Sequence, residues 1–135
     1  ATPISLGRGT DFPFQVIGHP KFSDTSFYFT PKPSSLSKEP KYLNLRCYGM
    51  DLRKERYLSL HPKKINLQWL FIMYKSIGSD AFFEKNFNYH SGNKELQEQI
   101  KNNTSEIEIR QTWEKGIENF KKTRKKYLLY LDLSE

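Results

Sequence analysis

Residues 7–20 constrain the fold more than any other stretch, because they hold three glycines and two prolines within fourteen positions. Glycine reaches backbone angles that other residues avoid, whereas proline fixes φ and has no amide hydrogen to donate. The start of the stretch therefore predicts a tight, exposed loop that presents Arg8 between two glycines. Residues 14–17 predict a short strand that a glycine and a proline then close.

An arginine presented in this way allows two interpretations. Its guanidinium can bind an anion, a carboxylate or a sugar ring. Alternatively, the segment is an ordinary turn whose arginine is solvated or caps a neighbouring group, and local chemistry alone favours this turn. Two phosphate-binding motifs are excluded, because Phe12 stands where a dinucleotide-binding loop has its third glycine and no Gly-Lys-Ser/Thr triplet occurs in the sequence.

The length of 135 residues predicts a single domain spanning 1–135, whose ten Phe, eight Tyr and two Trp can fill a core. The net charge of +7 suggests a nucleic-acid-binding domain. However, the basic excess is spread over both halves of the sequence. The one basic run, residues 121–126, lies in a helical pattern, where a solvated helix face is the simpler explanation. We therefore rank nucleic-acid binding low and expect no nucleic-acid partner.

Cysteine and histidine usage limits the possible sites. Cys47 is the only cysteine, which excludes a disulfide within this chain and a cysteine-based zinc site. The three histidines lack metal-ligand spacing, and no apolar run is long enough to span a membrane. We expect no metal, no cofactor and no membrane span. The chain opens on Ala1 without a methionine, so we expect a fragment or processed product that lacks an upstream part.

Strand patterns come first along the chain and helical spacing follows. The pattern predicts these elements in order: strands over 27–30 and 44–52, a helix over 67–77 that Gly78 ends, a helix over about 93–100, a helix that a Ser105–Glu108 capping box begins, and a last strand over 127–131. Because there is no βαβ alternation, we predict an α+β fold: a small mixed or antiparallel β-sheet packed by three to four helices.

Within the expected strand 44–52, Gly49 predicts a bulge or the close approach of another group. Asp51 lies two residues further on and is a candidate site residue, with a strand-end turn as the alternative.

Motifs along nearly the whole chain carry a family resemblance. They are Gly7-Arg8-Gly9-Thr10, Pro13-Phe14, Ile17-Gly18-x-Pro20, Phe29-x-Pro31, Cys47-Tyr48-Gly49 with Asp51-Leu52, Ile109-x-x-x-Trp113 with Gly116, Phe120-Lys121 and Arg124-x-x-Tyr127-Leu128-Leu129-Tyr130. Together they resemble the NamZ-type exo-β-N-acetylmuramidases, bacterial glycoside hydrolases that were formerly a domain of unknown function. The chain departs from the family pattern only at its tail.

The resemblance implies a two-domain protein, in which a Rossmann-like N-terminal domain precedes a smaller α+β domain and the active site lies between them. This chain is similar to the second domain only. The family removes N-acetylmuramic acid from the non-reducing end of peptidoglycan fragments, which requires carboxylic acids. We expect those catalytic residues in the missing N-terminal domain, and we expect this chain alone to be inactive. A periplasmic, envelope or secreted location is also implied.

Muramic acid carries a lactyl carboxylate, which Arg8 can bind in bidentate fashion. Loop amides such as that of Gly9 can bind sugar hydroxyls, as can Thr10, and Phe14 or Tyr48 can present a ring to the sugar. The substrate-binding residues that we predict are Arg8, Gly9, Thr10, Phe14, Tyr48 and Asp51. The alternative for Thr10 and Phe14 is that they build the turn and the core. The alternative for the whole chain is a non-catalytic cell-wall glycan-binding module.

Overall fold

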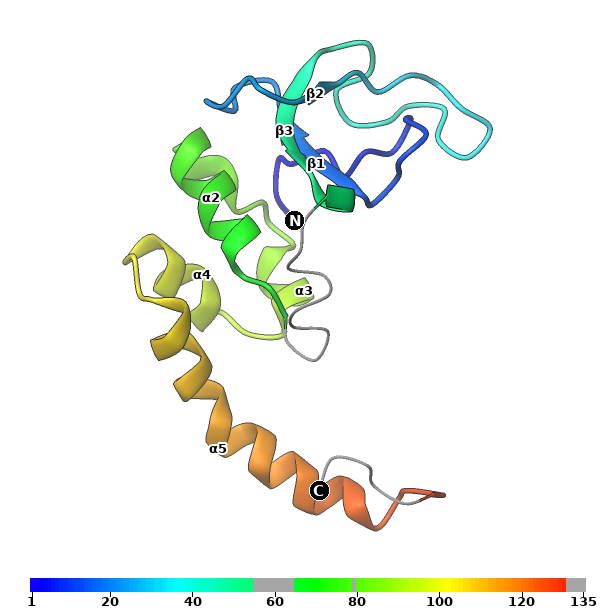
Figure 1. The fold of residues 1–135 in the computed structure, drawn as a ribbon. Coiled ribbons are helices and arrows are strands. Elements are labelled where there is room, and N and C mark those ends of the chain that lie inside the picture. The colour runs from blue at the N-terminus through cyan, green and yellow to red at the C-terminus, as the bar shows by residue number, and fades with distance from the viewer. Residues whose placement is uncertain (55–64, 79, 131–135) are drawn as a thin grey trace. The chain divides into compact units, whose positions relative to one another are not determined.

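The computed structural model describes residues 1–54, 65–78 and 80–130, which fall into two compact units (Figure 1). The first unit spans Ala1–Asn93 and the second begins at Lys94. The first is built around a β-sheet, whereas the described part of the second consists of helices and turns. The predicted substrate-binding residues therefore all belong to the first unit.

Three antiparallel strands form the sheet of the first unit, in the order β1-β3-β2 (Figure 1). Their bounds are Val16–His19 for β1, Tyr28–Phe29 for β2 and Cys47–Asp51 for β3. The predicted α+β class is confirmed, with an antiparallel sheet. β1 begins and ends two residues later than predicted, because Phe14 has a φ of 64°, a left-handed angle that a strand does not accommodate.

The centre of the sheet has no room for side chains on two facing residues. Gly18 of β1 lies opposite Gly49 of β3. A Cβ atom on Gly49 would overlap the carbonyl oxygen of Ile17. The close approach predicted at Gly49 is confirmed, and the register continues through this residue without a bulge.

A small apolar cluster underlies the sheet. Val16 and Cys47 are completely buried and contact Phe29, and Phe27 and Tyr42 pack around them. Burial raises the pKa of the Cys47 thiol to about 11. Cys47 is therefore a protonated packing residue and not a reactive thiolate.

The helices that the structure describes in the first unit are η1 (Leu52–Lys54), α2 (Gln68–Ile77), η2 (Asp80–Phe82) and α3 (Phe87–Ser91). The last three contribute to a cluster of aromatic rings. Gly78 ends α2 with a φ of 52°, as predicted. Neighbouring rings of the cluster have centroids 4.6–5.3 Å apart, and its members are Tyr74, Phe82, Phe83 and Phe87. These contacts give the unit a second apolar centre.

Glu84 bonds to both the first residue of this chain and Lys41. The ammonium group of Ala1 lies 2.9 Å from a carboxylate oxygen of Glu84, and the other oxygen of Glu84 lies 2.9 Å from Lys41 Nζ. The backbone N–H of Glu84 also donates to the carbonyl of Ala1 at 3.0 Å. The hydrogen bonds from the ammonium group and then from Lys41 lower the pKa of Glu84.

The second unit contains α4 (Glu95–Lys101) and α5 (Glu106–Lys125). The predicted capping box is confirmed: Ser105 Oγ accepts from the Glu108 N–H at 3.3 Å, and the Glu108 carboxylate accepts from the Ser105 N–H at 3.0 Å. Between residues 94 and 130, the buried apolar side chains belong to α4 and to the first turn of α5, and they are Leu96, Ile100 and Ile109.

The second half of α5 keeps its apolar side chains exposed, with exposed fractions of 49% at Ile117 and 64% at Phe120. The basic run 121–126 is mostly solvated, as expected. The last strand predicted over 127–131 is wrong for the described residues 127–130. The helix continues to Lys125, and the N–H of Tyr127 then donates to the carbonyl of Arg124 at 2.8 Å, which makes a turn.

Candidate functional site

Residues 7–15, here called the Arg8 loop, hold four of the six predicted substrate-binding residues. The loop leads directly into β1, whose first residue, Val16, lies opposite Asp51 at the end of β3. The backbone N–H of Leu52 donates to the carbonyl of Gln15 at 2.9 Å. The antiparallel register therefore brings Asp51 next to the base of the Arg8 loop, although the two are far apart in sequence.

The Arg8 loop is closed by its own backbone. Gly7 and Gly9 have φ values of 72° and 81°, which non-glycine residues rarely adopt. The N–H of Phe14 donates to the carbonyl of Leu6 at 2.7 Å, and the carbonyl of Gly9 accepts from the N–H of Lys32 at 2.8 Å. The tight loop predicted from the glycines is confirmed, and Lys32 ties it to the neighbouring segment.

Thr10 holds the loop together from within. Its hydroxyl donates to the carbonyl of Gly7 at 2.7 Å and accepts from the N–H of Phe12 at 3.1 Å. The hydroxyl hydrogen is thus used inside the loop, and only an oxygen lone pair is left for a ligand. The structure therefore favours the turn-building role of Thr10, whereas its predicted contact with a sugar stays a prediction.

Arg8 is exposed, with its guanidinium carbon 5.2 Å from the ring centroid of Phe14. Phe14 itself is 60% exposed. Across residues 1–54, 65–78 and 80–130, no carboxylate lies within ion-pair distance of Arg8. Within the described part of the chain, Arg8 therefore presents a positive charge without a paired carboxylate against the face of an exposed ring.

Asp51, in contrast, is fully engaged by a residue that the sequence analysis missed. One carboxylate oxygen of Asp51 lies 2.7 Å from Arg53 Nε and the other lies 2.8 Å from Arg53 Nη2. The guanidinium carbon of Arg53 lies 3.6 Å from the ring centroid of Phe12. The side chain of Asp51 is only 8% exposed, and its hydrogen bonds raise the pKa of Arg53. Asp51 is thus the anion of an ion pair and not a free acid.

The only sequence signal for the Asp51–Arg53 ion pair was that the two residues lie two positions apart. It indicates an ion pair only once the strand is known to end at Asp51 and a helical turn, η1, is known to follow. The stacking on Phe12 had no sequence signal, because it joins residues that the sheet brings together.

Tyr48 does not join this group. It lies three residues before Asp51 on β3, about 10 Å along the strand at roughly 3.3 Å per residue. Its ring packs against Tyr28 with centroids 6.5 Å apart, and Tyr28 in turn lies under the guanidinium of Arg46, 4.5 Å from its carbon. Tyr48 therefore belongs to the edge formed by β2 and β3, and its predicted role beside Arg8 stays a prediction.

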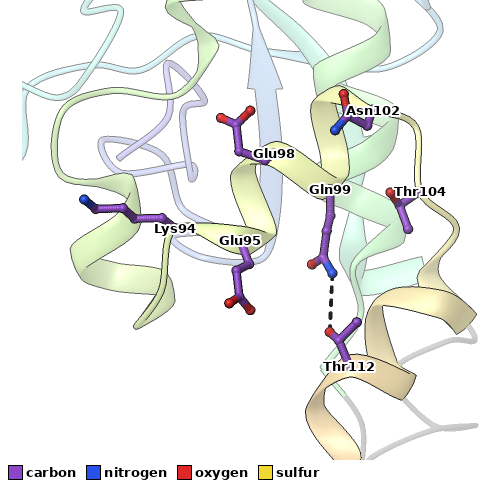
Figure 2. Close-up of a pocket in the computed structure, with 7 residues that line it drawn as sticks. All are labelled: Lys94, Glu95, Glu98, Gln99, Asn102, Thr104 and Thr112. Atoms are coloured by element: carbon purple, nitrogen blue, oxygen red, sulfur yellow. Dashed lines mark hydrogen bonds between the residues drawn. The ribbon is translucent and has the colours of Figure 1, made fainter.

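A separate hollow of about 600 Å³ lies in the second unit (Figure 2). The residues that line it are of polar and charged types: Lys94, Glu95, Glu98, Gln99, Asn102, Thr104 and Thr112. Gln99 Nε2 donates to Thr112 Oγ1 at 3.3 Å, and Glu98 pairs with Lys101 at 3.3 Å. Because none of the predicted substrate-binding residues lines this hollow, its shape does not support the predicted site.

The described part of the chain contains no group of three or more His, Cys, Asp or Glu residues that is placed to hold a metal ion. It also contains no helix that is both long and apolar enough to cross a membrane.

A family model, a curated relative and a solved structure all match nearly the whole of this chain. A family model described as "Exo-beta-N-acetylmuramidase NamZ, C-terminal" matches residues 1–130. The "Peptidoglycan beta-N-acetylmuramidase NamZ" of Bacillus subtilis (strain 168) is 31% identical over 142 aligned positions, which cover 96% of this chain and 34% of that protein.

A crystal structure of a DUF1343 family protein from Bacteroides fragilis NCTC 9343 is also similar. The two chains are 39% identical and superpose with a TM-score of 0.91, covering 97% of this chain and 37% of that chain. This chain therefore spans about a third of the length of the relatives that it matches.

Proposed function

This chain belongs to the family of NamZ C-terminal domains, and on that premise we propose that it forms one wall of the substrate cleft of a peptidoglycan-degrading exo-β-N-acetylmuramidase. The opposite wall belongs to a further domain of the natural protein, in keeping with relatives about three times as long. The substrate is a peptidoglycan-derived saccharide that ends in N-acetylmuramic acid. A location facing the cell wall, in the periplasm, the envelope or outside the cell, follows from that substrate.

One observation supports this role above the others: Arg8 is exposed, stacked on Phe14 and without an acidic partner among the described residues. A guanidinium in this state can form two parallel hydrogen bonds to a carboxylate. Muramic acid differs from glucosamine by a lactyl carboxylate. In this proposal Arg8 binds that carboxylate, and Phe14 lies against the sugar.

The proposal assigns no catalytic residue to this chain. Glycoside hydrolysis needs two carboxyl groups that flank the scissile bond. Both carboxylate oxygens of Asp51, which lies at the base of the Arg8 loop, are already held by Arg53 at 2.7 and 2.8 Å. The 135-residue chain alone is therefore expected to show no turnover.

Replacing Arg8 in the longer natural protein tests the proposal. We expect Arg8→Ala to lower kcat/KM on a muramic-acid-terminated saccharide by about 10- to 150-fold, the equivalent of a charge-assisted hydrogen bond of roughly 1.5–3 kcal/mol. Lys38→Ala is the matched control, because Lys38 is also an exposed cation of the first unit but lies outside the Arg8 loop. Wild-type kcat/KM for Arg8→Ala would refute the role of Arg8.

A non-catalytic cell-wall glycan-binding module is the second candidate. It is favoured by a second exposed ring stacked with an arginine, Tyr28 with Arg46, away from the Arg8 loop. Binding of the 135-residue chain to insoluble peptidoglycan, without turnover by the longer protein, would support this candidate. Steep weakening of binding by added salt would instead indicate a contact with a polyanion such as nucleic acid.

A further inference from the structure

We propose that Asp51 and Arg53 are positioning residues, which hold the Arg8 loop through Phe12 and so fix the direction in which Arg8 meets the substrate. The inference rests on the proposed function, since it takes Arg8 as the substrate contact. It adds which contacts keep the irregular Arg8 loop in the shape that substrate binding requires.

The ion pair between Asp51 and Arg53 is built on the sheet. Asp51 is the last residue of β3 and lies opposite Val16 of β1. Besides its two side-chain bonds, Arg53 donates its backbone N–H to Asp51 Oδ1 at 3.2 Å. A planar guanidinium held by two parallel bonds has little rotational freedom. Arg53 therefore has a defined orientation before it contacts the loop.

Arg53 contacts the loop through the ring of Phe12. The Arg53 guanidinium carbon lies 3.6 Å from the ring centroid, well inside the 6 Å range of cation–π contacts. Both backbone groups of Phe12 are bonded within the loop: its carbonyl accepts from the N–H of Gln15 at 3.1 Å, and its N–H donates to Thr10 Oγ1 at 3.1 Å. Phe12 therefore links Arg53, through its ring, to a backbone segment that is hydrogen-bonded within the loop.

The path from the sheet to Arg8 is short and continuous. Thr10 Oγ1 and Thr10 N donate to the carbonyl of Gly7 at 2.7 and 3.1 Å, and Gly7 directly precedes Arg8. The contacts thus run from Asp51 through Arg53, Phe12 and Thr10 to the residue next to Arg8. Because Gly7 and Gly9 allow wide backbone freedom on either side of Arg8, this support from the sheet adds to the loop's own hydrogen bonds in fixing the direction of Arg8.

Charge separates the roles of the two arginines. Arg53 and Asp51 neutralise each other, whereas Arg8 has no carboxylate within ion-pair distance among the residues that the structure describes. A neutral pair contributes little long-range attraction for an anionic sugar. The electrostatic attraction therefore comes from Arg8, and the contribution of the Asp51–Arg53 pair is geometric.

The test uses the 135-residue chain with two readouts, namely the amide order parameters of residues 8–12 and the affinity for N-acetylmuramic acid. N-acetylglucosamine, which lacks the lactyl carboxylate, is the control ligand. In Arg53→Met we expect the order parameters to fall from about 0.85 towards 0.6. We expect the affinity for N-acetylmuramic acid to fall about five- to tenfold, a coupling of ordinary size, and the affinity for N-acetylglucosamine to stay unchanged.

Conservative variants separate positioning from simple stability. Phe12→Tyr keeps a ring under Arg53 and is expected to retain both readouts, whereas Phe12→Leu loses them. Asp51→Asn keeps the side-chain volume but breaks the ion pair. It replaces Arg53→Met as the test variant if Arg53→Met fails to fold. In the double variant Arg8→Ala/Arg53→Met the affinity should equal that of Arg8→Ala alone, because a residue that acts through Arg8 has no effect once Arg8 is gone.

The outcomes distinguish this inference from the proposed function. Unchanged order parameters in Arg53→Met would overturn the inference. An additive loss of affinity in the double variant would overturn it as well, since Arg53 would then contact the sugar directly. If Arg8→Ala binds N-acetylmuramic acid as well as the unmodified chain does, the Arg8 contact of the proposed function fails, and the order parameters still decide whether Arg53 holds the loop.

Discussion

The Arg8 loop and the second half of α5 differ both in the regularity of their backbone and in their contacts with the rest of the chain. The loop has no regular secondary structure, yet its backbone is hydrogen-bonded to itself, to Lys32 and to Leu52, which directly follows β3. The second half of α5 is a regular helix, yet its apolar side chains, Ile117 and Phe120 among them, stay exposed. Regular backbone and tertiary support are therefore separate properties, and in this chain the better-supported region is the irregular one.

The two regions are stabilised by different kinds of contact. The loop depends on its own hydrogen bonds and on contacts with residues that are distant in sequence, namely Lys32, Leu52 and Arg53. The helix depends on its own hydrogen bonds, on the cap at Ser105 and on buried Ile109 near its start. Isolated helices are only marginally stable in water. We therefore expect the loop to be lost together with the sheet and the end of α5 to fray independently.

The largest effect should come from filling the narrowest point of the sheet. Gly49→Ala places a Cβ against the carbonyl of Ile17, so it must separate β1 from β3 and should lower the free energy of unfolding by about 3 kcal/mol or more. Gly116→Ala is the matched control, because a Cβ at this position would meet nothing within 4 Å beyond the neighbouring backbone of its own helix, and the helix should gain roughly 0.5–1 kcal/mol. Urea denaturation measures both. A tolerated Gly49→Ala would mean that the sheet does not support the loop.

A smaller effect is expected at the start of α5. Ser105→Ala removes the side-chain acceptor for the N–H of Glu108 and should cost about 1 kcal/mol. Glu108→Gln keeps the reciprocal hydrogen bond and should be close to neutral. The helical signal in circular dichroism during thermal unfolding distinguishes the two variants. Equal losses from both would assign the effect to charge at the helix start and not to the cap.

The smallest effect is expected near the end of α5. Phe120→Ser should change the free energy of unfolding by no more than about 0.5 kcal/mol, since the ring is 64% exposed. Phe82→Ser is the contrasting variant, because the Phe82 ring is completely buried and should cost several-fold more. A loss of about 2 kcal/mol for Phe120→Ser would show that this ring is covered in solution, and the contrast between the two regions would then disappear.

Features with local causes were predicted correctly from the sequence. The stop at Gly78 and the Ser105–Glu108 box each depend on residues within one helical turn, and the close approach at Gly49 depends on a strand and one missing side chain. The family resemblance was predicted from motifs and is confirmed by the match over residues 1–130.

Features set by distant contacts were predicted poorly. The left-handed angle of Phe14, which delays β1, is held by a bond to Leu6 and by the closed loop around it. The last strand failed because α5 continues to Lys125 in spite of the aromatic and leucine residues beyond it. The support of Phe12 by Arg53 was missed because the sheet register creates it.

The ion pair at Ala1 has a practical consequence for anyone who produces this domain. A purification tag or any residue joined ahead of Ala1 converts the ammonium into a neutral amide, so Glu84 loses that counter-ion and keeps Lys41. The carbonyl of Ala1 still accepts from the N–H of Glu84, which preserves the backbone connection. Tagged and cleaved preparations of the same sequence should therefore differ slightly in acid tolerance, and a comparison between variants needs the same amino terminus throughout.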